Sequence, residues 1–228
     1  MAKPRPVTRT PPATLWRIGR GADPLTTPIP DPTMLGTARS GNRFDSPSGS
    51  YRVLYFGTSL TACFGETLAR FRPDTHLLSV VKDEWEAMGF MDVSRVPADW
   101  RHRRSAVNVS LPADAPFLDV EHRSTREFLR TTLATGLSAL GHDDLDIAAV
   151  RGPDRRVTRM ISEWAYNATD DKGFAAYQGI RYLSRLDDDW ECWAVFEDAE
   201  ITVNTAMSIT LDLEPLQRVA ADYGLRVF

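Results

Sequence analysis

Residues 51–71, YRVLYFGTSLTACFGETLARF, contain a strand and a helix in direct succession. Residues 51–56 are rich in β-branched and aromatic side chains, which favour a strand, and Gly57 ends that strand. Thr58 or Ser59 then provides an N-cap, and we expect the helix to continue to about Phe71. The segment therefore predicts a β–α unit.

The two sides of this helix differ in a way that matters for function. An apolar stripe at helical spacing forms the predicted core face: Leu60, Phe64, Leu68 and Phe71. Another side carries small residues in place of charges: Ala62, Gly65 and Ala69. Glu66 lies beside these small residues. Such a face lets a backbone or a ligand approach closely, so we expect Glu66 in a partly enclosed cleft.

The remaining pattern predicts one α+β domain, a twisted mixed sheet with flanking helices. We expect further strands at 15–18, 77–81, 116–120 and 190–196, and helices at 126–140, 155–168 and 213–223. Residues 1–13 contain four prolines and are predicted to be a flexible N-terminal tail, which leaves 14–228 as the domain. Residues 19–42 form a long connection, of a kind that is usually functional or mobile.

Composition excludes several classes of protein. The formal net charge of −4 argues against a protein that binds nucleic acid directly, since such proteins carry a basic excess. No apolar run has the length of a membrane span, and the N-terminus lacks a secretory signal, so we expect a cytoplasmic protein with no membrane contact. Only two cysteines occur, which fits buried free thiols better than a disulfide framework or a metal site.

Common catalytic and nucleotide-binding motifs are missing. No G-x-G-x-x-G follows a strand, and the sequence has no P-loop, H-E-x-x-H or G-x-S-x-G. The four histidines share no ligand spacing, and the Asp-rich stretches at 143–144 and 187–189 are typical of surface turns. We therefore predict no metal.

Three segments remain: residues 15–18, LWRI; residues 41–66, with G-N-R-F at their start; and residues 179–185, GIRYLSR. In the second segment a strand carries Tyr55, and Glu66 follows eleven residues later on the helix. In this joint order the segments resemble the RES domain, the toxin of bacterial RES/Xre-type toxin–antitoxin pairs, over residues 14–200. The chain departs from the family pattern at Phe44-Asp45, where many members have Trp-Asn.

The resemblance implies a fold related to ADP-ribosyltransferases, with a sheet that grips NAD as substrate. It also implies the residues that line the cleft: Arg17, Arg43, Tyr55, Glu66 and Ser184. Of these, Glu66, Arg17 and Ser184 are the candidate catalytic residues. A helix-turn-helix, Xre-like antitoxin that inserts a segment into the cleft is the implied partner.

The chemistry of NAD is consistent with these residue types. Nicotinamide is already cationic, so breaking its bond to ribose needs no general acid, and one carboxylate beside the developing positive charge is sufficient. Glu66 fits that role, while Arg17 and Arg43 would bind the diphosphate, Tyr55 would stack on nicotinamide, and Ser184 would orient Glu66. Each has a structural alternative: a solvated helix glutamate, arginines in salt bridges, a core tyrosine and a turn serine.

Three functions stay open at this point. The first is cleavage of NAD with water or inorganic phosphate as acceptor (an NAD glycohydrolase or phosphorylase), which would deplete NAD and arrest growth. The second is ADP-ribosylation of a protein. The third is a non-catalytic domain that binds a nucleotide or a partner.

Overall fold

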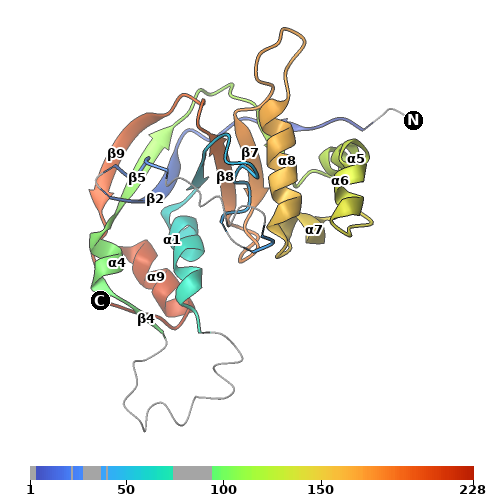
Figure 1. The fold of residues 1–228 in the computed structure, drawn as a ribbon. Helices are drawn as coiled ribbons and strands as arrows, with labels where there is room; N and C mark the ends of the chain where they lie inside the picture. The colour runs from blue at the N-terminus through green and yellow to red at the C-terminus, as the bar shows by residue number, and fades with distance from the viewer. Residues whose placement is uncertain (1–3, 22, 28–36, 40, 74–93) are drawn as a thin grey trace.

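Eight strands form one mixed sheet, and two short strands form a second (Figure 1). The computed structural model describes residues 4–21, 23–27, 37–39, 41–73 and 94–228. The strands are β1 Thr8–Arg9, β2 Leu15–Arg20, β3 Val53–Gly57, β4 Arg95–Val96, β5 Arg104–Ser110, β6 Phe117–Asp119, β7 Gly179–Leu183, β8 Glu191–Phe196, β9 Thr202–Ser208 and β10 Arg226–Val227. The helices are α1 Leu60–Leu68, α4 Ala98–His102, α5 Arg123–Thr132, α6 Ala134–Ala139, α7 Ile147–Arg151, α8 Arg155–Asn167 and α9 Glu214–Asp222, and the 3₁₀ turn η2 spans Ala69–Phe71.

The large sheet has the order β1-β6-β7-β8-β3-β2-β5-β9. Only β6 and β7 are parallel among its described pairs. The central strands β2 and β3 meet through a single register pair, Trp16↔Gly57, whereas β2 pairs with β5 over its whole length. The sheet is therefore loosely joined between β2 and β3, where Arg17 and Tyr55 lie.

The β–α unit predicted from residues 51–71 is confirmed in its main features. Ser59 is the N-cap of α1, and its hydroxyl accepts a hydrogen bond from the Ala62 backbone N–H. Phe64 and Leu68 are fully buried in a cluster that also contains Trp100 and the buried face of α9. The helix ends at Leu68, and η2 continues the chain to Phe71.

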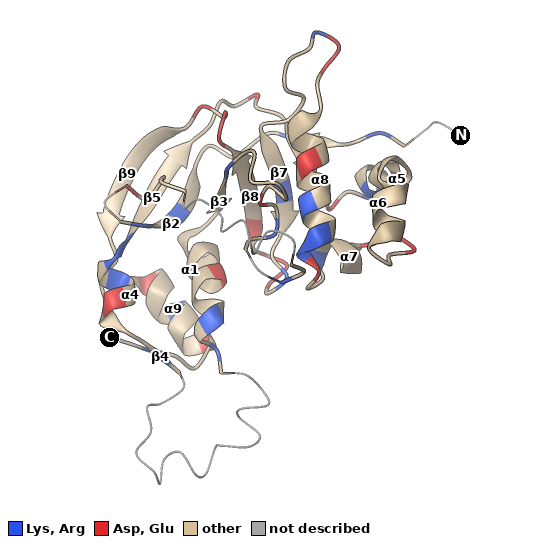
Figure 2. Ribbon diagram, viewed as in Figure 1, with Lys and Arg blue, Asp and Glu red and all other residues tan. Residues whose placement is uncertain are grey.

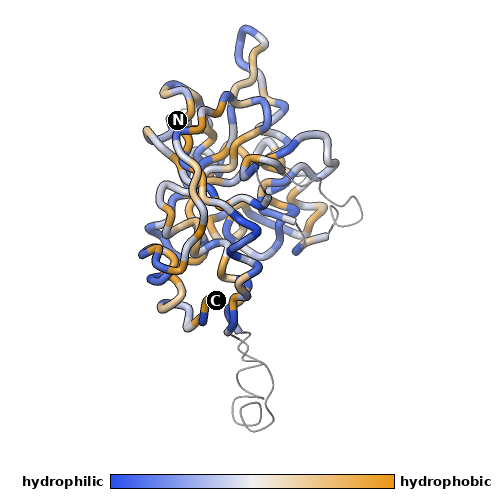
Figure 3. The backbone as a smooth tube through the Cα atoms, turned by 90° about the vertical axis from the view of Figure 1, so that its left-hand side faces the viewer, coloured by the Kyte–Doolittle hydropathy of each residue, from blue (hydrophilic) through white to orange (hydrophobic). Residues whose placement is uncertain are grey.

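Helices cover the sheet in two groups. Near β2, α1 packs on α9, while α8 packs on β7, with α5, α6 and α7 on the outer flank beyond α8 (Figure 1). Strand β1, near the described start of the chain, lies far from the C-terminus (Figure 1), and hydrophobic and hydrophilic stretches alternate along the described chain (Figure 3). Within the described residues, every helix is too short or too polar to cross a lipid bilayer.

Two predictions about secondary structure need correction. The helix expected at 126–140 is two helices that meet at Leu133. The hydroxyls of Thr131 and Thr132 donate back to the carbonyls one turn earlier, a contact that bends helices. The sequence pattern also gave no indication of strands β5 and β9. The strand expected at 77–81 lies outside the described residues.

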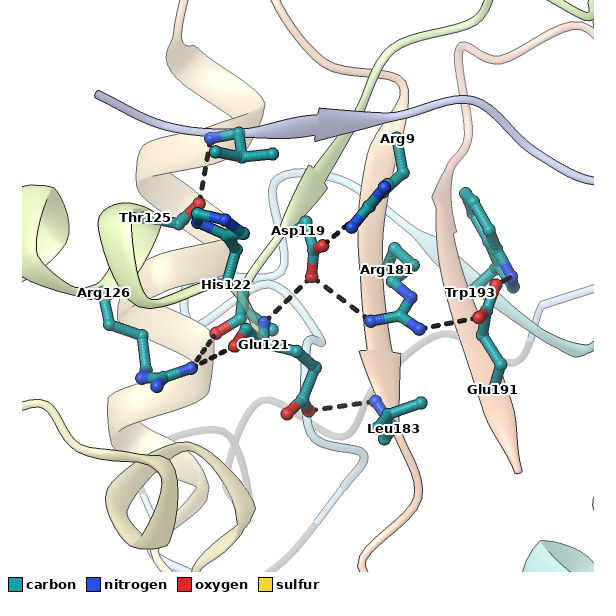
Figure 4. Close-up of polar contacts among 12 residues, drawn as sticks. Arg9, Asp119, Glu121, His122, Thr125, Arg126, Arg181, Leu183, Glu191 and Trp193 are labelled. Carbon is teal, nitrogen blue, oxygen red and sulfur yellow. Dashed lines mark hydrogen bonds and ion pairs between the residues drawn. The ribbon is translucent and has the colours of Figure 1, made fainter. Parts of the chain in front are cut away.

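The N-terminal segment needs a further correction. The sequence predicts a flexible tail at residues 1–13, but β1 pairs with β6, and the Val7 backbone N–H donates to Thr125 Oγ1. Arg9 also forms an ion pair with the buried Asp119 (Figure 4). Proline-rich composition is misleading here, because an edge strand needs only a few backbone hydrogen bonds and one long-range ion pair.

Candidate functional site

A cavity of about 920 Å³ lies between α1, α8 and the strands β2 and β3. Its volume is in the upper part of the range of small-molecule sites, which is roughly 300–1,000 Å³. Four of the five predicted site residues line it: Arg17, Arg43, Tyr55 and Glu66. Ser184 is fully buried behind the wall and contacts Glu66. The structure thus brings together residues from three separate segments of the chain.

Glu66 presents its carboxylate to the cavity from α1. Its side chain is exposed, and Ser184 Oγ donates to Glu66 Oε1 at 2.5 Å. Ser184 Oγ also accepts a hydrogen bond from the Leu186 backbone N–H at 3.0 Å, which fixes the direction of its own proton. The hydrogen bond that the sequence predicts between Ser184 and Glu66 is therefore present.

The small-residue side of α1 explains how Glu66 is placed. Gly65 is buried against the indole of Trp190, and a Cβ added at Gly65 would lie 2.0 Å from Trp190 Cη2. The Trp190 carbonyl accepts a hydrogen bond from the Ser184 backbone N–H at 2.8 Å. Because α1 lies so close to the β7–β8 turn, Ser184 can reach the glutamate.

Arg17 occupies the loose junction between β2 and β3. Its Nε donates to the Pro24 carbonyl at 2.8 Å, and its Nη1 donates to the Tyr55 carbonyl at 3.2 Å. Burial lowers the pKa of its guanidinium, although nearby Cys63 and Tyr55 oppose that shift. Among the described residues Arg17 thus donates to backbone carbonyls and forms no ion pair, so the salt-bridge alternative does not apply to it.

Arg43 also binds carbonyl groups. Its Nη1 donates to Val150 O at 2.8 Å and to Gly152 O at 3.0 Å, and its Nη2 donates to Arg151 O at 3.3 Å. These carbonyls end α7, where a cation is favourable. Burial lowers the pKa of Arg43, and Glu66 is among the groups that oppose this shift. Arg43 therefore braces one wall while its remaining N–H donors can face a ligand.

Tyr55 lines the cavity with its hydroxyl already engaged. The hydroxyl donates to Asp45 Oδ1 at 2.8 Å and accepts from the Phe44 backbone N–H at 2.9 Å. Burial, followed by the Asp45 carboxylate, raises the pKa of Tyr55 well above its ordinary value. The Phe44-Asp45 departure from the family pattern thus has a structural role, because Asp45 holds the tyrosine.

The cavity contains more arginines than the sequence motifs indicate. Among the residues that the structure describes, nine arginines line it against two acidic residues, Asp45 and Glu66. Besides Arg17 and Arg43 they are Arg20, Arg52, Arg70, Arg104, Arg155, Arg159 and Arg185. Basic positions on α8 and on the segment after α1 are visible in Figure 2. A chain of net negative charge therefore concentrates positive charge in one cavity.

These arginines are hard to find from sequence because charge clusters are usually solvated. Arg155 and Arg104 belong to such clusters, yet each is partly buried in the cavity wall. The neighbouring Arg156 and Arg103 do form surface ion pairs, with Asp154 and Asp99. Arginines of the cavity wall could have been distinguished from those on the surface only by the side of the helix or strand on which each lies. That assignment requires correct bounds for the helix or strand.

The arrangement can bind a small anionic molecule beside one oriented carboxylate. Arginine forks match phosphate oxygens in pairs, and a low-dielectric wall strengthens such contacts. Among the described residues, no three His, Cys, Asp or Glu side chains are grouped as metal ligands. The buried thiols of Cys63 and Cys192 also reach the wall, and burial raises the pKa of both.

Comparisons with known proteins agree with this architecture. The sequence matches the RES domain over residues 14–214. A solved structure, "Crystal structure of the M.tuberculosis MbcT-MbcA toxin-antitoxin complex", contains a chain with the same fold. The TM-score is 0.53 at 16% sequence identity, and the alignment covers 94% of this chain and 92% of that chain. No curated protein sequence matches. Since the match extends from the residue before β2 to the first residue of α9, the chain belongs to the RES domain family.

Proposed function

We propose that this protein cleaves the bond between nicotinamide and ribose in NAD. One observation carries the proposal: the Glu66 carboxylate, oriented by the buried Ser184, lies at the wall of a cavity that is otherwise rich in arginine. A carboxylate among cations suits a substrate that has negative phosphates at one point and develops positive charge at another.

The reaction needs only this carboxylate and a nucleophile. The bond between ribose C1′ and the nicotinamide nitrogen breaks, and its electron pair neutralises the cationic ring. The ribose becomes oxocarbenium-like, and Glu66 stabilises that charge. An acceptor oxygen then bonds to C1′, and its proton passes to the solvent. Removing one preorganised charged group from a transition state typically costs about 100-fold or more in rate.

Substrate binding is assigned to the arginines and to Tyr55. Arg155 and Arg185 line the cavity and form no ion pair among the described residues, so their N–H donors would be available to the diphosphate. Arg17 and Arg43 have part of their donors on backbone carbonyls and would contribute the rest. The Tyr55 ring would stack on nicotinamide while Asp45 holds its hydroxyl.

The acceptor is water or inorganic phosphate in this proposal, and either reaction would consume cellular NAD and arrest growth. The protein would then act as the toxin of a toxin–antitoxin pair. The similar solved structure, which is that of a toxin–antitoxin complex, supports this role. The proposed partner is a helix-turn-helix antitoxin that inserts a segment into the cavity. Co-purification of the protein encoded by the adjacent gene would test that partner.

The activity test compares Glu66→Gln with Glu214→Gln. Glu214 is an exposed glutamate at the start of α9, paired with Arg218 and absent from the cavity wall. We expect wild type and Glu214→Gln to release nicotinamide from NAD equally, and Glu66→Gln to be slower by about 100-fold or more. Chromatography with and without phosphate would identify the ribosyl product. Full nicotinamide release by Glu66→Gln would overturn the mechanism, and tight NAD binding without turnover would favour a binding domain.

A further inference from the structure

Arg20, Arg70 and Arg104 form a second basic group in the cavity, separate from Arg155 and Arg185. Arg20 ends β2 and Arg104 begins β5, and the two residues are direct register partners in the antiparallel pair. Like charges at directly opposed positions destabilise a sheet. Arg70 adds a third positive charge from η2, four residues after Glu66.

None of the three arginines forms an ion pair among the described residues, and the Asp99 carboxylate, which pairs with Arg103, only partly offsets the effect of Arg20 and Arg70 on Arg104. Arg104 is nevertheless held in place. Its guanidinium lies over the Trp100 ring at 4.8 Å from the centroid, and its Nη1 donates to the Trp100 carbonyl at 2.9 Å. Burial, then Arg20 and Arg70, lowers the pKa of Arg104 to about 10. The fold thus keeps three cations together at a cost in stability.

Local conflicts of this kind are usually retained for function. We propose that Arg20, Arg70 and Arg104 form a second anion subsite that binds a phosphate group separate from the diphosphate of the substrate. As a part of the substrate cavity, this subsite rests on the proposed function. Three guanidinium forks around one tetrahedral dianion satisfy most of its oxygens, and the anion removes the repulsion between Arg20 and Arg104.

The cavity that the subsite shares with Glu66 gives it a chemical role. Arg70 follows Glu66 by four residues, in η2 directly after α1, and both side chains line the cavity. A phosphate in the subsite would therefore occupy the same cavity as the carboxylate proposed to face ribose C1′. Two sources have this chemistry: free inorganic phosphate, which would serve as acceptor, and a phosphate monoester on the nucleotide, as in NADP.

The test uses the double variant Arg20→Ala/Arg70→Ala, because both side chains are exposed and their loss should leave the fold intact. Arg103→Ala is the matched control, since Arg103 is an exposed neighbour of Arg104 that pairs with Asp99 outside the cavity. The first measurement is binding of inorganic phosphate to the full chain by calorimetry at constant ionic strength. We expect binding by wild type and by Arg103→Ala, and at least about tenfold weaker binding by the double variant.

KM measurements then distinguish free inorganic phosphate from a phosphate monoester on the nucleotide. If free phosphate is the ligand, the double variant raises the KM for phosphate in NAD cleavage and leaves the KM for NAD unchanged. If a nucleotide monoester is the ligand, it raises the KM for NADP over that for NAD. Equal phosphate binding by the double variant and wild type, together with unchanged KM values for phosphate and NADP, overturns the subsite. Phosphate binding that is lost in the double variant, in a protein that cleaves neither nucleotide, would uphold the subsite and reject the proposed function instead.

Discussion

Ser184 Oγ donates a hydrogen bond to Glu66 Oε1 at 2.5 Å and so joins the turn after β7 to α1 across 118 residues of sequence. Ser184 is 1% exposed, whereas the Glu66 side chain is exposed to the cavity. A buried hydroxyl therefore restricts the rotamers of a carboxylate that a ligand can reach. This relationship gives Ser184 a positioning role in the proposed reaction.

We expect Ser184→Ala to slow nicotinamide release by about 10- to 100-fold, the equivalent of one hydrogen bond to a charged group. Glu66 would still be present but free to rotate, so the loss should fall on kcat more than on the KM for NAD. Ser138→Ala on the exposed side of α6 is the control. A Ser184→Ala enzyme with unchanged kcat would show that Glu66 needs no such support.

The close approach of α1 to the β7–β8 turn gives a second prediction. In Gly65→Ala the new methyl group would overlap the Trp190 ring, which must move and carry the Trp190 carbonyl away from the Ser184 N–H. Overpacking of this kind typically costs about 1–3 kcal/mol in the free energy of unfolding. Urea denaturation should show that loss, with Thr61→Ala on the same helix as control. An unchanged midpoint in urea would mean that Trp190 has room to shift.

Much of the β–α unit is predictable because its signals are local. The Ser59 cap, the Phe64 and Leu68 stripe and the small side at Gly65 are each decided within one turn of chain. By contrast, β9 escapes prediction because nearly all its residues are exposed, so it shows no alternation of burial. It exists because β5 provides a long antiparallel partner.

The candidate site likewise has a part that can be predicted from sequence and a part that cannot. Glu66 and Ser184 are named by the resemblance to the RES domain, and the structure shows their contact. The uses of Arg17 and Arg43 are not predictable, because backbone carbonyls from residues 24, 55 and 150–152 carry no sequence signal as acceptors. The basic group of Arg20, Arg70 and Arg104 depends on the register of β2 with β5, a strand that the sequence pattern does not indicate.

The Asp119 network predicts a graded effect on stability. Asp119 is 2% exposed and bonds Arg9, Arg181 and the Glu121 backbone N–H (Figure 4). Asp119→Ala leaves the mostly buried Arg181 with one fewer carboxylate, so we expect a loss of about 3 kcal/mol in the free energy of unfolding. Arg9→Ala removes a side chain that is 58% exposed and should cost less than about 1 kcal/mol. Equal losses in urea denaturation would contradict this ranking.

Cys63 makes the stability sensitive to alkaline pH. Burial is the main cause that raises the pKa of its thiol from 9.0 to about 12, and its Sγ donates to the Trp16 carbonyl at 3.0 Å. Between these two pH values the unfolded thiol has lost its proton while the folded thiol keeps it. The folded state therefore binds more protons there, and the free energy of unfolding falls as pH rises.

Below pH 9 we expect ionisation of Cys63 to have no effect on the free energy of unfolding. Above pH 9 the free energy of unfolding should decline, and the decline should be shallower in Cys63→Ala, as urea denaturation at several pH values would show.

The same burial should make the Cys63 thiol slow to react, because the thiolate is the nucleophile. Iodoacetamide at pH 8 should label Cys63 in urea much faster than in the folded protein, as mass spectrometry of the peptides would show. Rapid labelling of the folded protein would mean that the α1 wall of the cavity opens readily, and the restraint that Ser184 places on Glu66 would then be transient.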